Sequence, residues 1–158
     1  MKKAVLLTAL ALVLGLCPGF AQEPKMALGL GPEFNMDSRE NFAGGAVLAF
    51  TFNLPVAAVP LAVGLTVTGS YNFDGIFVGE PAALFRWYFL GGGHTGLFVQ
   101  ADLGAFLILE DGDLTPLFNG GLRAGYRVPL GEMFYLEPYA RGGYPFVFGV
   151  GLMAGLRF

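Results

Sequence analysis

The chain has 158 residues, of which 54% are hydrophobic and only 13% charged, against about 25% charged in an average soluble domain. Its formal net charge of −3 lacks the basic character of nucleic-acid-binding proteins, so we expect no nucleic-acid partner. One cysteine and one histidine exclude a disulfide framework and a Cys or His metal cluster. We therefore expect no metal site and no cofactor.

Residues 1–21 have the pattern of a secretory signal peptide. Lys2 and Lys3 form a positive start, an uncharged apolar stretch follows, and small residues occupy the two key positions before the cleavage point. We predict that this segment is removed and that 22–158 form one domain. Cys17 leaves a lipoprotein signal open, although a large residue precedes it. An uncleaved N-terminal anchor is a further alternative.

The apolar segment 46–67 is long enough for a membrane helix and carries no charge. Pro55 and Pro60 argue against a helix, because each removes a backbone donor and clashes with the preceding turn. The glycine and β-branched content on both sides favours strands. We therefore predict two strands joined by a turn.

Strict alternation of apolar residues with small or polar ones decides the fold class. It covers 61–73, 97–109 and 146–158. These runs exceed the 5–6 residues of typical globular strands and match the roughly 9–11 residues that cross a membrane. Glycine, rather than lysine or glutamate, dominates the less apolar face. The pattern therefore indicates lipid outside and an enclosed polar interior.

Eight strands account for the mature chain, and strands in lipid must close on themselves because every backbone group must pair. We predict an all-β, closed, antiparallel, eight-stranded transmembrane barrel with up-and-down order. The expected strands are 26–34, 42–53, 61–73, 76–89, 97–109, 118–128, 134–143 and 146–158. The expected turns are 35–41, 54–60, 74–75, 91–95, 110–116, 129–132 and 142–145.

The inward face collects the charged residues of the predicted strands. Buried charges are costly unless they pair, and the planar arginine fork suits carboxylates, so we expect an Arg–carboxylate network that fills the interior. Its expected members are Glu80, Arg86, Asp102, Arg123, Arg127, Glu137, Arg141 and Arg157. The many inward glycines and alanines leave open a second interpretation, a narrow water path lined by arginines.

The last strand ends with apolar residues at alternate positions, Leu152, Ala154, Leu156 and the terminal Phe158. This resembles the C-terminal signal that the barrel-assembly machinery recognises in bacterial outer-membrane proteins. Together with the eight strands, it resembles the small barrels of the OmpA-transmembrane, OmpX and OmpW kind. The resemblance implies a Gram-negative outer-membrane location, periplasmic termini, lipid and the assembly machinery as partners, and a monomer.

With that topology, aromatic residues form two bands at the expected interfaces. The outer band would be Phe34, Phe42, Tyr71, Phe73, Phe118 and Phe146, and the periplasmic band Phe50, Phe52, Trp87, Phe89, Tyr126, Phe134 and Phe158.

The expected function is that of an integral outer-membrane protein with a structural or surface role, for which the sequence identifies no ligand. A porin-like passive channel and an exported soluble β-barrel binding protein are the alternatives. No enzyme is expected, because the single His94 lies in a predicted turn without a nucleophile at useful spacing. We assign no catalytic, cofactor-binding or metal-ligating residue.

Overall fold

The computed structural model describes residues 24–54, 60–72, 76–90, 94–110 and 113–158. The predicted signal peptide therefore lies outside the described residues, as do Phe73 and the predicted turn at 74–75. No helix long and apolar enough to cross a membrane occurs in the described part of the chain. The strands are β1 (Met26–Asp37), β2 (Phe42–Asn53), β3 (Leu61–Asn72), β4 (Phe77–Leu90), β5 (Gly96–Glu110), β6 (Asp113–Leu130), β7 (Phe134–Tyr144) and β8 (Phe146–Arg157).

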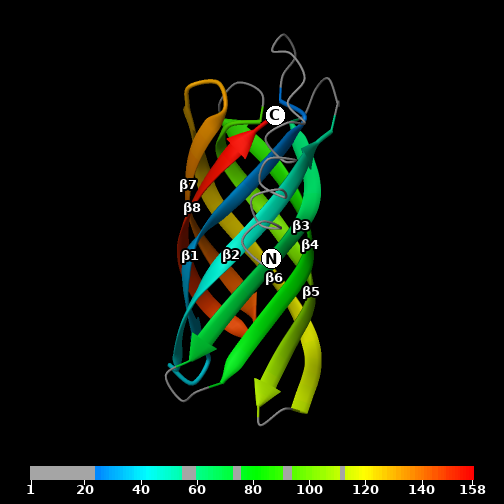
Figure 1. The fold of residues 1–158 in the computed structure, drawn as a ribbon, viewed down its shortest axis with the longest axis vertical. Helices are drawn as coiled ribbons and strands as arrows, with labels where there is room; N and C mark the ends of the chain where they lie inside the picture. Colours follow the sequence, from blue (N-terminus) through cyan, green and yellow to red (C-terminus); the bar gives the residue numbers. More distant parts are fainter. Residues whose placement is uncertain (1–23, 55–59, 73–75, 91–93, 111–112) are drawn as a thin grey trace, which may run out of the picture.

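The eight strands form one closed antiparallel barrel in sequence order, with β1 paired to β8, as the sequence predicts (Figure 1). At the seam, Met26 N donates to Phe158 O at 2.8 Å and Phe158 N donates to Met26 O at 2.9 Å. Both ends of the described chain thus lie at one end of the barrel, called here the terminal end. The opposite end, called the distal end, carries the 38–41 turn and the turn at Pro145.

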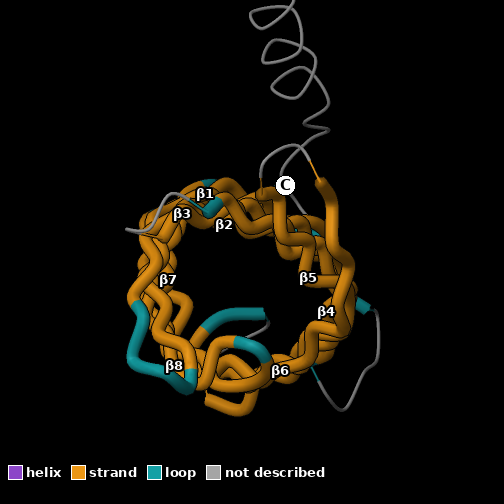
Figure 2. Tube along the Cα trace, turned by 90° about the horizontal axis from the view of Figure 1, so that it is seen from below, coloured by secondary structure: helices purple, strands orange, loops and turns teal. Residues whose placement is uncertain are grey.

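The predicted faces are present along most of each strand. Leu65 and Leu103 face outward with 61% and 62% of their surface exposed, whereas Thr66 and Asp102 face inward and are buried. The view along the axis shows the strands as a ring (Figure 2), and inward side chains occupy the space within it. An exposed apolar wall around a polar interior is the reverse of a soluble protein's arrangement.

Exposed aromatic residues lie toward both ends of the outer face, as predicted. The terminal end carries Phe50, Phe52, Trp87, Phe89, Tyr126 and Phe134, and the distal end carries Phe34, Phe42, Tyr71 and Phe118. Phe158 is only half-buried at the terminal end.

Strand β6 begins at Asp113, so the predicted turn over 110–116 is too long, and residues 113–116 belong to the strand. The ladder with β5 continues to the pair Glu110–Asp113, and the β5–β6 hairpin extends beyond its neighbours (Figure 1). Pro116 lies within this extension. Strand β7 pairs with β6 only from Gly120 onward, so Pro116 faces a side without a partner strand. A proline is tolerated there because no ladder bond requires its missing donor.

Strand β8 begins with a change of face that the sequence analysis missed. The pairing of β1 with β8 shifts register between Met36 and Asp37, so that Met36 pairs with Phe148 and Asp37 with Phe146. Val147 is the extra residue, and both Val147 and Phe148 point outward. A bulge of this kind reverses the alternation before it. Phe146 is consequently buried inside the barrel, not in the outer aromatic band.

Candidate functional site

The centre of the lumen holds a cluster of ion pairs around Glu33. Arg123 Nη1 and Arg141 Nη1 lie 2.9 and 2.8 Å from the two oxygens of the Glu33 carboxylate. Arg123 also pairs with Asp102 at 2.8 Å, and Arg141 with Glu80 at 2.8 Å. Each of these two guanidinium groups therefore bridges two carboxylates.

A second cluster surrounds Glu137, nearer the terminal end. Arg86 Nη1 and Nη2 donate to the two Glu137 oxygens at 2.8 and 2.9 Å, and Arg127 Nε donates to one of them at 2.6 Å. Gln100 joins this cluster to the first, because its Oε1 accepts from Arg86 at 2.6 and 2.8 Å while its Nε2 donates to Asp102 at 2.6 Å. The two clusters form one continuous chain of polar contacts.

This chain of contacts is charge-balanced. Four arginines face four carboxylates, every one at most 5% exposed, and we call these eight residues the ionic network: Glu33, Glu80, Arg86, Asp102, Arg123, Arg127, Glu137 and Arg141. Four of the six ion pairs join strands that are not neighbours, namely β4 with β7, β1 with β6 and β1 with β7. The ionic network thus crosses the lumen instead of lining one wall.

Inward aromatic rings support the arginines. The Cζ atom of Arg86 lies 4.0 Å from the Phe98 ring centroid, and that of Arg127 lies 4.2 Å from the Tyr135 centroid. Such contacts stabilise buried guanidinium groups. Glycine makes room for the tyrosines, because a Cβ added at Gly155 would overlap the Tyr135 ring.

The structure places seven of the eight predicted network residues in ion pairs. The exception is Arg157, which forms no ion pair within the described residues. Its Nη2 donates to the carbonyls of Gly131 and Glu132 at 2.9 and 3.3 Å, because Arg157 ends β8 and the β6–β7 turn lies beside it. The predicted assembly signal at Leu152, Ala154, Leu156 and Phe158 forms the last part of the seam strand, and its recognition stays a prediction.

Glu33 is the network residue that sequence reasoning missed. It accepts hydrogen bonds from Tyr139 and Asn35 in addition to its two arginines. Its signal was its position within β1, two residues before the inward Asn35 and next to the outward Phe34. Glycines and Pro32 hide this alternation in the first strand.

The distal end of the lumen is apolar instead of charged. Buried Ala43, Val78, Phe106 and Phe146 form a cluster, against which Ile76 and Ile108 pack. Phe106 and Phe146 meet edge to face, with ring centroids 5.5 Å apart. Arg141 Cζ lies 6.0 Å from the Phe146 ring centroid, so the apolar cluster rests directly on the ionic network.

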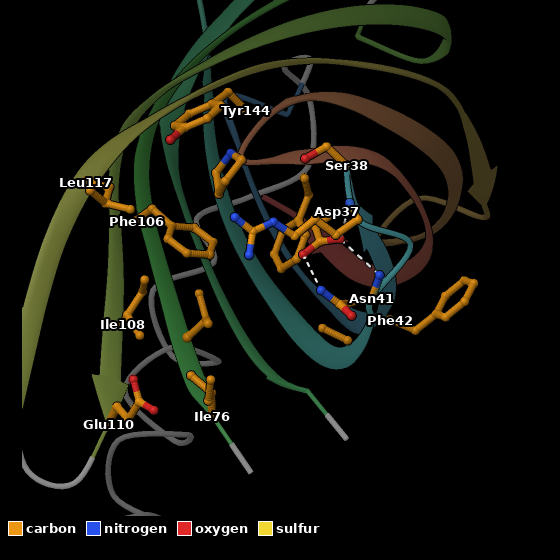
Figure 3. A pocket seen from close by; sticks show the side chains of 15 residues that line it. Asp37, Ser38, Asn41, Phe42, Ile76, Phe106, Ile108, Glu110, Leu117 and Tyr144 are labelled. Atoms are coloured by element: carbon orange, nitrogen blue, oxygen red, sulfur yellow. Dashed lines mark hydrogen bonds between the residues drawn. The ribbon is translucent and has the colours of Figure 1, made fainter. Parts of the chain in front are cut away.

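Above this cluster lies a pocket of about 420 Å³, shown in Figure 3. We call it the distal pocket; Phe106, Phe146, Val78 and Ile108 line its apolar part, and Asp37, Arg39 and Glu110 line its charged part. The Asp37 carboxylate is engaged by its own turn, where it accepts from Arg39 N at 2.7 Å and from Asn41 N and Nδ2 at 2.9 Å each. A concave, mostly apolar site of this size suits a small molecule.

No comparable grouping marks a metal centre in the described part of the chain. No three His, Cys, Asp or Glu residues there are placed to hold a metal ion. His94 lies at the terminal end, with Nε2 3.0 Å from Leu61 O and its ring packed edge to face on Tyr88.

These features define a class of structure, the small closed barrel of eight antiparallel strands, here with ion pairs across its lumen. No family model and no curated protein matches the sequence. Solved structures share the fold. OprG, an outer-membrane protein from Pseudomonas aeruginosa, has a TM-score of 0.58 at 11% identity, over 87% of this chain and 97% of that one. Neisserial surface protein A (NspA) has a TM-score of 0.55 at 13% identity, over 84% and 94%.

A de novo designed transmembrane β-barrel has the same fold as well, with a TM-score of 0.52 at 14% identity over 88% of this chain and all of the design. The chain therefore has the fold of the small bacterial outer-membrane barrels, as the resemblance in its last strand implies. Since a design shares it, the fold by itself carries no particular activity.

Proposed function

We propose that the protein is an integral outer-membrane barrel with a structural or surface role, and that its ionic network keeps the lumen closed to solutes. The observation that carries the proposal is the balanced set of four arginines and four carboxylates that crosses the lumen. The apolar outer face and its two aromatic bands support the membrane location, as does the fold shared with NspA and OprG.

Closure follows from the size of the barrel and the cost of separating charges. Eight strands enclose a space that side chains just fill. Opening a path along the axis would separate buried ion pairs such as Arg86–Glu137, and breaking a buried pair costs about 3–5 kcal/mol. A network that bridges opposite strands is therefore a stable obstruction.

Planar-bilayer recording tests this closure. The purified protein is expected to show no reproducible ion conductance. A charge-neutral variant with Arg86, Glu137, Arg141 and Glu80 all changed to Ala loses three of the four cross-lumen pairs and is expected to show current steps. Arg157→Ala is the matched control, since this arginine lies outside the ionic network, and it is expected to stay silent. Steady single-channel steps from the unmodified protein would overturn the proposal.

One observation favours the porin-like alternative enough to name it. Thr68 Oγ1, Ser70 Oγ and Asn119 Oδ1 are buried inward and have no hydrogen-bond partner within the described residues. Water molecules could satisfy these atoms, and a continuous file of them would be a thin conduit beside the ionic network. The same recordings decide between the two functions. For the soluble alternative, we expect no stable protein without detergent or lipid, which extraction tests directly.

Export and assembly are part of the proposal. Residues 1–21 would direct export, the termini would face the periplasm, and the barrel-assembly machinery would recognise the strand that ends in Phe158. The monomer would then contact only outer-membrane lipid.

A Phe158→Ser substitution tests the assembly step. We expect less heat-modifiable, folded protein in cell envelopes but normal refolding of the pure chain in detergent. Phe134→Ser is the control, because Phe134 is an exposed aromatic residue at the same end. Equal losses for both variants in cells would contradict a specific signal at Phe158.

A further inference from the structure

We propose that the distal pocket binds a small amphipathic cation, with the apolar body of the ligand on the Phe106–Phe146 floor and its ammonium group beside Glu110. This goes beyond the proposed function and does not depend on whether the lumen conducts. It rests on the shape of the distal pocket, the chemistry of its floor and the charge of its rim.

The floor favours an apolar body. Ala43, Val78, Phe106 and Phe146 are each at most 6% exposed and close the bottom of the pocket. Elsewhere the inner face of the barrel is mostly charged, hydroxylated or glycine. An apolar concavity that opens at the end of the barrel gains free energy when a ligand displaces its water. Its volume of about 420 Å³ lies within the range of small-molecule sites.

The charged residues at the rim of the distal pocket indicate that the charged group of the ligand is positive. Three charged residues line the distal pocket: Asp37, Arg39 and Glu110. Arg39 and Asp37 belong to one turn, where the positive charge of Arg39 acts on the Asp37 carboxylate, so their charges offset each other locally. Glu110 forms no ion pair within the described residues and remains as the net charge of the lining. Within the described residues, the whole distal rim has four carboxylates and one guanidinium group, namely Asp37, Glu40, Glu110 and Asp113 with Arg39.

Geometry places Glu110 at the opening above the apolar floor. It ends β5, two residues after the inward-packed Ile108 and four after Phe106, and Figure 3 shows these three residues along one strand. A ligand that lies along this strand can contact the phenyl ring with its apolar part and the carboxylate with its cation.

The floor also explains why the ligand would be held and not passed on. Arg141 lies directly beneath Phe146 and is bound to Glu33 and Glu80. An amphipathic cation that moved deeper would meet this guanidinium group. The arrangement is therefore that of a binding site that a ligand enters from the distal end.

The chain provides its own reporters for a test. Ile76 and Ile108 are its only isoleucines, and both line the distal pocket. Protein labelled at isoleucine and methionine methyl groups, in nanodiscs of zwitterionic lipid, would be titrated by NMR. The three probes share one apolar body: 4-tert-butylbenzylammonium, 4-tert-butylbenzyl alcohol and 4-tert-butylbenzoate. Met153 in the lumen and Met133 at the terminal end serve as internal controls.

We expect saturable shifts of both isoleucine signals, with the cation bound most tightly and the carboxylate most weakly, while the signals of Met133 and Met153 stay in place. Glu110→Gln should weaken binding of the cation about three- to fivefold, the scale of one partly exposed ion pair, and leave the alcohol unchanged. Asp113→Asn is the matched control, because Asp113 pairs with Glu110 across the hairpin but does not line the pocket.

Ile108→Trp should fill the distal pocket and abolish the shift of Ile76, with folding checked by heat modifiability. No shift with any probe, equal or tighter binding of the carboxylate, or an equal loss in the Asp113 variant would overturn the proposal. Uniform shifts of isoleucine and methionine signals would show partition into lipid instead of binding, and would overturn it as well.

Discussion

Two layers of one lumen, the ionic network and the distal pocket, follow opposite rules. In the ionic network every charge has an ion-pair partner, and four of the six pairs cross the barrel. In the distal pocket the inner face turns apolar, the side chains leave a cavity, and the rim carries excess negative charge. All eight charges of the ionic network are in ion pairs, although Arg127 Nη1 has no hydrogen-bond partner within the described residues, whereas the distal pocket is an open cavity. Under the two proposals, one barrel combines a closed centre with a ligand-binding distal end, and four changes can test this contrast.

The largest effect is expected inside the ionic network. Glu137→Ala leaves both Arg86 and Arg127 without their carboxylate. Removing one partner of a buried pair costs about 3–5 kcal/mol, so we expect that loss in urea unfolding from lipid vesicles. Glu132→Ala, in an exposed turn, is the control and should change stability by no more than about 0.5 kcal/mol. Similar losses for both would show that the pairs contribute little.

The second prediction concerns a charge on the outer, lipid-facing side of the barrel, in contrast to the paired charges of the inner side. Leu103 lies midway along β5 and points outward. Leu103→Arg should cost about 2–4 kcal/mol, because a cation at the bilayer midplane is poorly solvated. Phe118→Arg, nearer the distal end, should cost about 0–1 kcal/mol by the same measurement. Equal costs would contradict the assigned depth of the two positions.

The packing of the central layer predicts an intermediate effect. A Cβ at Gly151 would overlap the Tyr139 ring, whereas a Cβ at Gly79 would make only ordinary contact with Leu107 at 3.9 Å. Gly151→Ala should therefore destabilise the barrel by about 1–3 kcal/mol. Gly79→Ala should stay within about 0.5 kcal/mol. Equal unfolding midpoints for these two variants would mean that the lumen is more loosely filled than described.

The smallest effect is expected at the rim of the distal pocket. Asp37→Ala removes three hydrogen bonds that shape the 38–41 turn. Because this turn is exposed, we expect a loss of about 1 kcal/mol, seen as a small decrease in unfolding midpoint. Asp113→Ala should leave the midpoint unchanged. A loss as large as that of Glu137→Ala would erase the energetic difference between the two layers.

The sequence predicts the central layer better than the distal one, for a physical reason. Strict alternation around Gln100 and Asp102 assigns faces without any tertiary knowledge, and charges on an enclosed face must pair. The distal pocket depends instead on two local irregularities. The extra Val147 turns Phe146 inward, and Pro116 lies on a stretch of β6 that pairs with β5 but not with β7. The alternation of residues in the sequence reveals neither a bulge nor the absence of a partner strand on one side.

The two remaining misses concern single residues. Glu33 lies in a strand whose glycines and Pro32 obscure the alternation, so its charge was overlooked although its face follows from Asn35. Arg157 has the right face but lies at the last position of β8, where a turn carbonyl is nearer than any carboxylate of the ionic network. Periodicity assigns the face of a side chain but not its height along the axis.

The cross-lumen pairing also bears on the order of events during biogenesis. Glu33 comes from the first strand, while its partners Arg123 and Arg141 come from the sixth and seventh. In a chain that has formed only its early hairpins, the charge of Glu33 has no arginine partner. The charge of Glu80 likewise has no partner until the strand that carries Arg141 has paired. Full neutralisation coincides with the curling of the sheet into a cylinder. The pairing of the inward charges thus favours the closed barrel, and their unpaired state disfavours a sheet in which only some strands have paired.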